Sequence, residues 1–158
     1  MLTNSPDFTF HYRNLQQYYG LSVKYPDKTK WGELELSPFG RGFGGIGLPG
    51  DYSPASRFVK AAFLANNSPS ESDEQKRIAH FFHDLDSVSM PKGIVFTQDG
   101  KEEITLYSCC MSPQSGTYYY KTYYNSRLSA VKMQREDMDG DTLKEFPLDH
   151  TANIQWLN

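Results

Sequence analysis

The pattern of apolar positions follows a helical period in the first part of the chain and a strand-like period after Pro91. The strongest helical stretch predicts a helix over Asp73–Val88. Its apolar residues repeat at three- and four-residue spacing and fall on one face: Ile78, Phe81, Phe82, Leu85 and Val88. Ser72 followed by Gln75 is typical of a capping box, which marks the start of this helix.

Two shorter helices are predicted before it. One runs over Asp7–Gly20, with Asp7 or Thr9 as its N-cap and Gly20 as a stop. The other runs over Arg57–Ala65. Ser53 and Ser56 are both suitable N-caps for the second helix, and Pro54 suits a first helical position. The first residues, Met1–Pro6, suggest the end of a strand that enters a turn.

A long connection over Leu21–Gly50 separates these two helices and shows little periodicity. Connections of this length inside a domain are usually functional or form an interface. Four of its large apolar residues are Trp31, Leu34, Leu36 and Phe39. We expect these side chains to pack on the body of the protein or on another subunit, because exposing them together is unfavourable.

Alternating apolar and polar residues after Pro91 predict four strands, over 93–97, 103–110, 117–122 and 127–133. The connections contain Asp99-Gly100 and other turn signals, so consecutive strands should pair antiparallel. The tail, 134–158, suggests one short helical turn and a final extended piece near Trp156. Helices followed by an antiparallel β-meander predict an α+β fold, with helices on one face of a sheet.

Composition excludes several classes of function. The chain has 158 residues, 15% aromatic content and a net charge of −3, with the two signs well mixed. Neither nucleic acid nor an anionic membrane is therefore an expected partner. No apolar run is long enough to cross a bilayer, and no signal peptide is expected. The only cysteines, Cys109 and Cys110, are adjacent, which argues against a mutual disulfide and favours a reducing, cytoplasmic location.

Three motifs suggest ligands, and none has the required context. Gly40–Gly45 matches G-x-G-x-x-G but lacks a buried strand before it and a helix opening from it, so a flexible loop is the better interpretation. The acidic run Asp137–Asp141 lacks the glycine and the glutamate of a calcium loop. His80 and His83 have no further ligand at metal spacing. We therefore expect no metal and no cofactor.

One arginine stands out. Arg57 lies in the first turn of its predicted helix, where the helix macrodipole disfavours a cation. A charge placed against a local rule can mark a functional site, although a solvated surface arginine is the more common explanation. The residues alone therefore indicate an α+β domain with a Gly/Pro-rich loop that leads to an arginine, without a complete catalytic set.

Two segments carry a more specific resemblance. Leu2–Pro6, LTNSP, resembles the L-T-N-x-P motif of the choloylglycine hydrolase family, which contains bile salt hydrolases and penicillin V acylases. Gly45–Asp51, followed by Ser56–Val59, is similar to the family's G-x-G-L-P-G-D and S-R-F-V segments. Further matches occur in the family's order at 92–93, 105–108, 118–120 and 123–126. The resemblance covers essentially the whole chain.

The resemblance implies an N-terminal-nucleophile hydrolase with an αββα sandwich. Such an enzyme hydrolyses a linear amide C–N bond, releasing glycine or taurine from a conjugated bile salt or the side chain from a penicillin. Its nucleophile is a cysteine at the start of the chain, whose own α-amine acts as the base. Asn4 matches the family asparagine that donates to the oxyanion. Arg57 matches the arginine beside the thiol, which favours the thiolate.

The sequence departs from the family at its start. It begins Met1-Leu2, without the nucleophilic cysteine, and has about half the family's length. Residues 1–158 therefore resemble the C-terminal portion of one such bacterial domain, expected to be inactive alone and to need an N-terminal half. The resemblance also implies a homotetramer in the full-length form. Alternatives are a penicillin V acylase-like fragment or a non-catalytic domain that binds bile acid or a partner chain. The residues leave the preferred substrate open.

Overall fold

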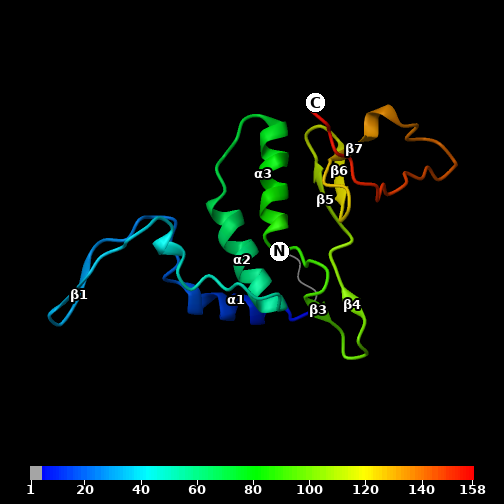
Figure 1. Cartoon of the computed structure of the whole chain (residues 1–158). Helices are drawn as coiled ribbons and strands as arrows, with labels where there is room; N and C mark the ends of the chain where they lie inside the picture. The colour runs from blue at the N-terminus through cyan, green and yellow to red at the C-terminus, as the bar shows by residue number, and fades with distance from the viewer. Residues whose placement is uncertain (1–4) are drawn as a thin grey trace. The chain divides into compact units, whose positions relative to one another are not determined.

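A computed structural model describes residues 5–158, which form two compact units. Figure 1 shows the three α-helices and the short strands of this part of the chain. The first unit contains the residues up to Ser72 together with Asp86–Val88, and the second contains Asp73–Leu85 together with Ser89–Asn158. The α+β class is confirmed. The strand end expected over Met1–Pro6 falls mostly outside the described residues.

Helix α1, Phe8–Leu15, opens the first unit. Its N-cap is Asp7, whose Oδ1 accepts a 2.8 Å hydrogen bond from the backbone N–H of Phe10. A 3₁₀ turn, η1 (Gln16–Tyr18), extends the helix toward Gly20. The predicted helix over Asp7–Gly20 is therefore confirmed, with Asp7 as its cap, although its last turn is a 3₁₀ turn that ends at Tyr18.

Helix α2, Pro54–Asn67, packs against α1 in the same unit. The imidazole of His11 stacks on the ring of Phe58, with the ring centroids 4.3 Å apart. The buried side chains of Val59 and Ala62, also on α2, form the small apolar core of the unit. The sequence placed this helix over Arg57–Ala65, so it begins three residues earlier and ends two residues later than predicted.

The connection between α1 and α2 contains a hairpin that the sequence interpretation missed. Strands β1 (Thr29–Trp31) and β2 (Leu34–Leu36) pair antiparallel around a turn at Gly32, whose φ is +58°. The hairpin stands clear of the helices of its unit in Figure 1. Trp31 is 72% exposed and Phe39 is 93% exposed, so the expectation that these side chains pack on the body of the chain is wrong. Packing on another subunit stays a prediction.

Helix α3, Glu74–Asp86, supplies most of the core of the second unit. Ile78 and Phe82 are buried, as the helical pattern predicts, whereas Phe81 is exposed. The cap is Asp73, whose Oδ1 accepts from the backbone N–H of Lys76 at 2.8 Å. The capping box predicted from Ser72 is therefore wrong by one residue, because the carboxylate of Asp73 accepts the hydrogen bond from the first turn and takes the capping position.

Strands β5 (Tyr107–Ser112), β6 (Thr117–Thr122) and β7 (Ser129–Lys132) form an antiparallel sheet in the order β5-β6-β7. This is the predicted meander. A separate hairpin pairs β3 (Val95–Phe96) with β4 (Glu102–Glu103) around the turn predicted at Gly100. The strand predicted over 103–110 is wrong as a single element, because the chain leaves one hairpin and enters the other sheet within it.

After β7 the chain makes one 3₁₀ turn, η3 (Met133–Arg135), and contains no further strand or helix up to Asn158. The helical turn expected in the tail is therefore present. A buried side chain, Asn125, fixes the path of the tail, since its Nδ2 donates to Oδ2 of Asp149 at 3.0 Å. The hydroxyl of Thr122 donates to the backbone carbonyl of Asp149 at 2.6 Å.

Candidate functional site

The loop that leads to α2 is closed by a tight backbone contact. The N–H of Ser22 donates to the carbonyl of Gly44 at 2.8 Å. A Cβ atom on Gly44 would lie 2.4 Å from the carbonyl oxygen of Ser22, so this position accepts only glycine without a backbone shift. Gly47 has a φ of +98°, which other residues rarely adopt. The glycines of this stretch therefore shape a turn and need no phosphate to explain them.

Asp51 organises the start of α2. Its Oδ1 accepts from the backbone N–H of Ser53 at 2.9 Å, and its Oδ2 accepts from the hydroxyl of Ser56 at 2.6 Å. Ser53 is the N-cap, because its side chain accepts from the N–H of Ser56 at 3.3 Å. Pro54 occupies a first helical position, as predicted. Hydrogen bonds from Ser53 and Ser56 lower the pKa of Asp51 to about 2.

This network predicts an acid-sensitive helix start. The folded pKa of Asp51 is about 2, below its ordinary value of 3.8. The carboxylate therefore stabilises the fold above about pH 4, and this contribution is lost as the pH falls toward 2. We expect hydrogen-exchange protection at the first amides of α2 to fall across that window. In Asp51→Asn this protection should not change between pH 4 and pH 2. Asp27→Asn, in the exposed loop, should behave as wild type. An unchanged pH dependence in Asp51→Asn would contradict this assignment.

Arg57 follows directly on this capped turn. Its backbone N–H donates to the carbonyl of Ser53 at 2.9 Å, which fixes the residue in the first turn of α2. The side chain is half-buried, and its Nε lies in the protein with no hydrogen-bond acceptor among residues 5–158. A buried guanidinium N–H without a partner is unfavourable by about 1–3 kcal/mol. The structure thus holds a cation whose Nε lacks an acceptor.

The second predicted site residue, Asn4, lies outside the described residues. The expected approach of Asn4 and Arg57 to a common reaction centre therefore stays a prediction. Sequence reasoning missed the role of Asp51 in supporting Arg57. The signal was present as an aspartate two residues before one serine and five before another, a spacing that favours side-chain hydrogen bonds to the following turn.

The other motifs do not form a reaction centre. No group of three or more His, Cys, Asp or Glu side chains that could hold a metal occurs in the described part of the chain. The Gly40–Gly45 motif follows an exposed two-stranded hairpin and contains only the short turn η2, Phe43–Gly45. Both cysteines are free, and burial raises the pKa of the Cys110 thiol, which disfavours the thiolate.

Glu74, in the first turn of α3, accepts hydrogen bonds from two side chains of the β5–β6 hairpin. It accepts from the hydroxyl of Ser115 at 2.5 Å and from that of Tyr119 at 3.1 Å. Hydrogen bonds from Ser115 and then from Ser112 lower the pKa of Glu74. This carboxylate is therefore held ionised and joins the helix to the β5–β6 hairpin, which is a structural role.

Comparison with known proteins assigns the family. The model for linear amide C–N hydrolases of the choloylglycine hydrolase family matches residues 1–146. The chain belongs to the choloylglycine hydrolase family. Among its relatives are bile salt hydrolase/transferases from Clostridium perfringens, 39% identical over 158 residues, and from Lactiplantibacillus plantarum, 41% identical over 158 residues. These alignments cover all of this chain but 48% and 49% of those proteins.

Solved structures of related proteins resemble this chain in fold. A crystal structure of a variant of the conjugated bile acid hydrolase from C. perfringens matches 99% of this chain and 48% of that protein, with a TM-score of 0.85 and 39% identity. Penicillin V acylase from Agrobacterium tumefaciens matches 85% of the chain with a TM-score of 0.62 and 22% identity, which indicates the same fold. The expected N-terminal-nucleophile hydrolase fold is confirmed. The chain spans about half the length of the relatives that it matches.

Among the described residues, no helix is both long enough and apolar enough to cross a membrane.

Proposed function

We propose that this chain is one half of an amidase that hydrolyses the C–N amide bond of conjugated bile salts and releases glycine or taurine. The observation that carries the proposal is the buried Nε of Arg57, which has no hydrogen-bond partner among residues 5–158 and lies on a capped helix. The chain that holds it spans 48% of a bile salt hydrolase relative. The relatives at 38–42% identity act on bile salts by name, whereas the penicillin V acylase is 22% identical. This difference favours bile salts over penicillins.

The proposed roles follow from the chemistry of a thiol nucleophile. The other half supplies a cysteine at its N-terminus, and the α-amine of that cysteine takes the thiol proton. The thiolate attacks the amide carbonyl, and the side-chain N–H of Asn4 donates to the oxyanion that forms. Arg57 lies beside the thiol and stabilises the thiolate as a fixed cation. Collapse of the intermediate releases the amine, and water then hydrolyses the thioester.

A cation at the start of α2 fits this role. The helix dipole makes this position unfavourable for Arg57 in the isolated chain, and a thiolate next to it would offset that effect. The capped turn at Ser53 and Asp51 fixes the backbone of Arg57, so the guanidinium is placed by a rigid element. The 158-residue chain alone should not turn over substrate, because its first residue is a methionine and not the cysteine that the mechanism needs.

The test compares the chain alone with the chain joined by the missing half. The purified 158-residue protein is incubated with glycocholate, taurocholate and penicillin V, and the released amine is measured. The same assay is run after co-expression with the part of the C. perfringens enzyme that this chain does not match. We expect no turnover alone and bile salt turnover by the pair. Turnover by the chain alone, or an assembled pair without amidase activity, would refute the proposal.

The proposal extends to the assembly and its location. We propose that the completed enzyme forms a homotetramer in the bacterial cytoplasm, where its thiol stays reduced. Both described cysteines are free, which agrees with a reducing compartment. Sedimentation of the completed enzyme tests the tetramer, and a monomer would contradict it. Fractionation of the producing cells tests the location, and recovery outside the cytoplasm would contradict that part.

A further inference from the structure

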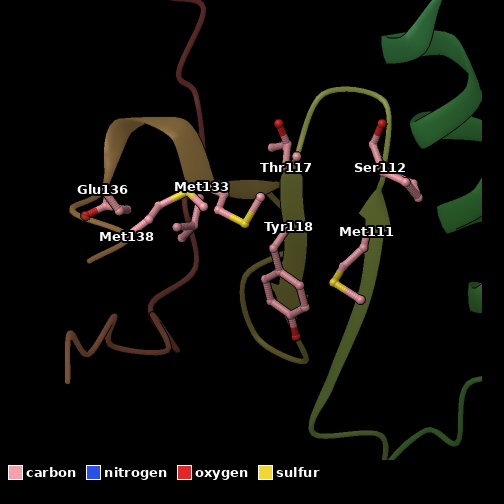
Figure 2. Close-up of a pocket in the computed structure, with 10 residues that line it drawn as sticks. Met111, Ser112, Thr117, Tyr118, Met133, Glu136 and Met138 are labelled. Carbon is pink, nitrogen blue, oxygen red and sulfur yellow. The ribbon is translucent and has the colours of Figure 1, made fainter. Parts of the chain in front are cut away.

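Three buried polar atoms of the first unit have no hydrogen-bond partner among residues 5–158: Nδ1 of His11, Nδ2 of Asn14 and Nε of Arg57. They belong to α1 and to the first turn of α2, the two helices that pack on each other. By contrast, an apolar hollow of about 600 Å³ in the second unit is lined by such side chains as Met111 and Tyr118, and none of the three atoms borders it (Figure 2). In the described part of the chain, the buried polar atoms that lack a partner are therefore confined to the α1–α2 pair.

His11 is the most deeply buried of these three residues, at 4% exposure. Its ring stacks on Phe58 with the two planes 18° apart, and the ring of Phe10 meets it edge-on with the centroids 5.6 Å apart. A phenylalanine at position 11 would make the same ring contacts without burying a nitrogen. Since a buried polar atom without a partner destabilises a fold, an imidazole at this position indicates a role besides packing.

The stack of His11 on Phe58 joins the two helices next to the proposed site residues. Phe58 directly follows Arg57 in α2. Asn4 precedes Asp7, the N-cap of α1, by three residues. Because the Cα–Cβ bonds of an α-helix tilt toward its N-terminus, the imidazole of His11 is directed toward the end of α1 that follows Asn4. The stack therefore fixes the start of α1 relative to the turn that carries Arg57.

We propose that His11 is a positioning residue for Asn4: its Nδ1 makes a hydrogen bond with the segment Leu2–Asn4, and its stack on Phe58 sets the place of that segment relative to Arg57. This inference rests on the proposed function, in which Asn4 donates to the oxyanion. Such a donor acts in the transition state, so holding it in place raises kcat and leaves substrate binding unchanged. The bond also gives the buried Nδ1 the partner that it lacks among residues 5–158.

The first test needs no activity and uses the 158-residue chain. His11→Phe keeps an aromatic ring against Phe58 and removes Nδ1. We expect hydrogen exchange at the backbone amide of Asn4 to become about two- to tenfold faster, as for the loss of one hydrogen bond. Tyr12→Phe, at an exposed neighbour on α1, is the control and should exchange as wild type. Equal exchange at Asn4 in wild type and His11→Phe would overturn the inference.

The second test uses the completed enzyme. His11→Phe should lower kcat about tenfold, which is less than the roughly 100- to 1000-fold effect of removing an oxyanion donor, and should leave KM and the pH profile unchanged. Combined with Asn4→Ala it should have no further effect, because the residue that it positions is gone. A merely structural role would lower kcat by the same factor with and without Asn4. That additive result, or a wild-type kcat in His11→Phe, would overturn the inference.

Exchange at the amides of α1 checks that the helix persists in each variant. If His11→Phe loses it, Phe58→Leu takes its place, since it frees the imidazole from its stack and should give the same results.

The combined results separate this inference from the proposed function. If exchange at Asn4 responds to His11→Phe while the wild-type pair has no amidase activity, the link between His11 and Asn4 stands and the proposed function fails. If the wild-type pair is active and His11→Phe changes neither exchange nor kcat, the proposed function stands and the inference is wrong. If kcat falls without a change in exchange at Asn4, the partner of Nδ1 belongs to the other half of the enzyme, and the inference is wrong as well.

Discussion

Replacing Arg57 by alanine in the completed enzyme should lower kcat/KM about 100-fold and shift its pH profile. An opposite charge within about 4–6 Å of an ionisable group moves its pKa by about 1–3 units, and each unit changes the ionised population tenfold. Without the guanidinium, the acidic limb of the kcat/KM profile should therefore move upward by about 1–3 pH units. The rate at which iodoacetamide alkylates the nucleophile, followed against pH, measures the same shift directly.

A lysine at position 57 separates charge from geometry. In the proposed site Arg57→Lys would keep a cation beside the thiol, so the pH profile should move less than in Arg57→Ala. The rate should still fall, because an ammonium lacks the planar set of donors of a guanidinium. Arg13→Ala is the control, since Arg13 lies exposed in the last turn of α1. An Arg57→Ala enzyme with the wild-type rate and profile would remove Arg57 from the site.

Replacing Val59 by aspartate should unfold the first unit. Val59 has 0% exposure and lies at the centre of a core that contains few other fully buried apolar residues in the described chain. An uncompensated buried charge destabilises by about 3–5 kcal/mol, which is a large share of the stability of a small domain. Amides of α1 and α2 should therefore lose their hydrogen-exchange protection, while those of the second unit keep theirs.

The matched control for this change is Ala65→Asp in the same helix. Ala65 is exposed near the end of α2, so its carboxylate stays in water and meets only the unfavourable end of the helix dipole. That effect is about 0.3–1 kcal/mol. Protection of α2 should survive in this variant. Equal loss of protection in both variants would show that helix electrostatics, and not the buried core, decides the stability of the unit.

Local sequence signals account for most of the fold. Asp7, Ser53 with Pro54, and Gly100 were each identified from chemistry that acts within a few residues, and each occupies the predicted cap or turn. The β1–β2 hairpin was missed because its strands have three residues each and no buried side chain, so no periodic pattern marks them. Its only local signal was the turn glycine Gly32.

The candidate site could be predicted only through the family resemblance. Helix signals in the sequence predict that Arg57 lies in the first turn of a helix. They do not identify the reacting group on which this cation would act. The cysteine nucleophile that the resemblance implies is marked by no pattern in this sequence, so neither periodicity nor spacing could identify the reaction. Asp51 is a different case, because its spacing to Ser53 and Ser56 favours the observed hydrogen bonds, and the sequence interpretation overlooked that signal.

The two tryptophans of the chain lie in different units, and both are exposed. Trp31 is 72% exposed in the β1–β2 hairpin, and Trp156 is 78% exposed in the tail. Since neither indole leaves a core when a unit unfolds, tryptophan emission should change little during denaturation. Emission is instead suited to report assembly, because a partner that covers either indole would shift its maximum to shorter wavelength.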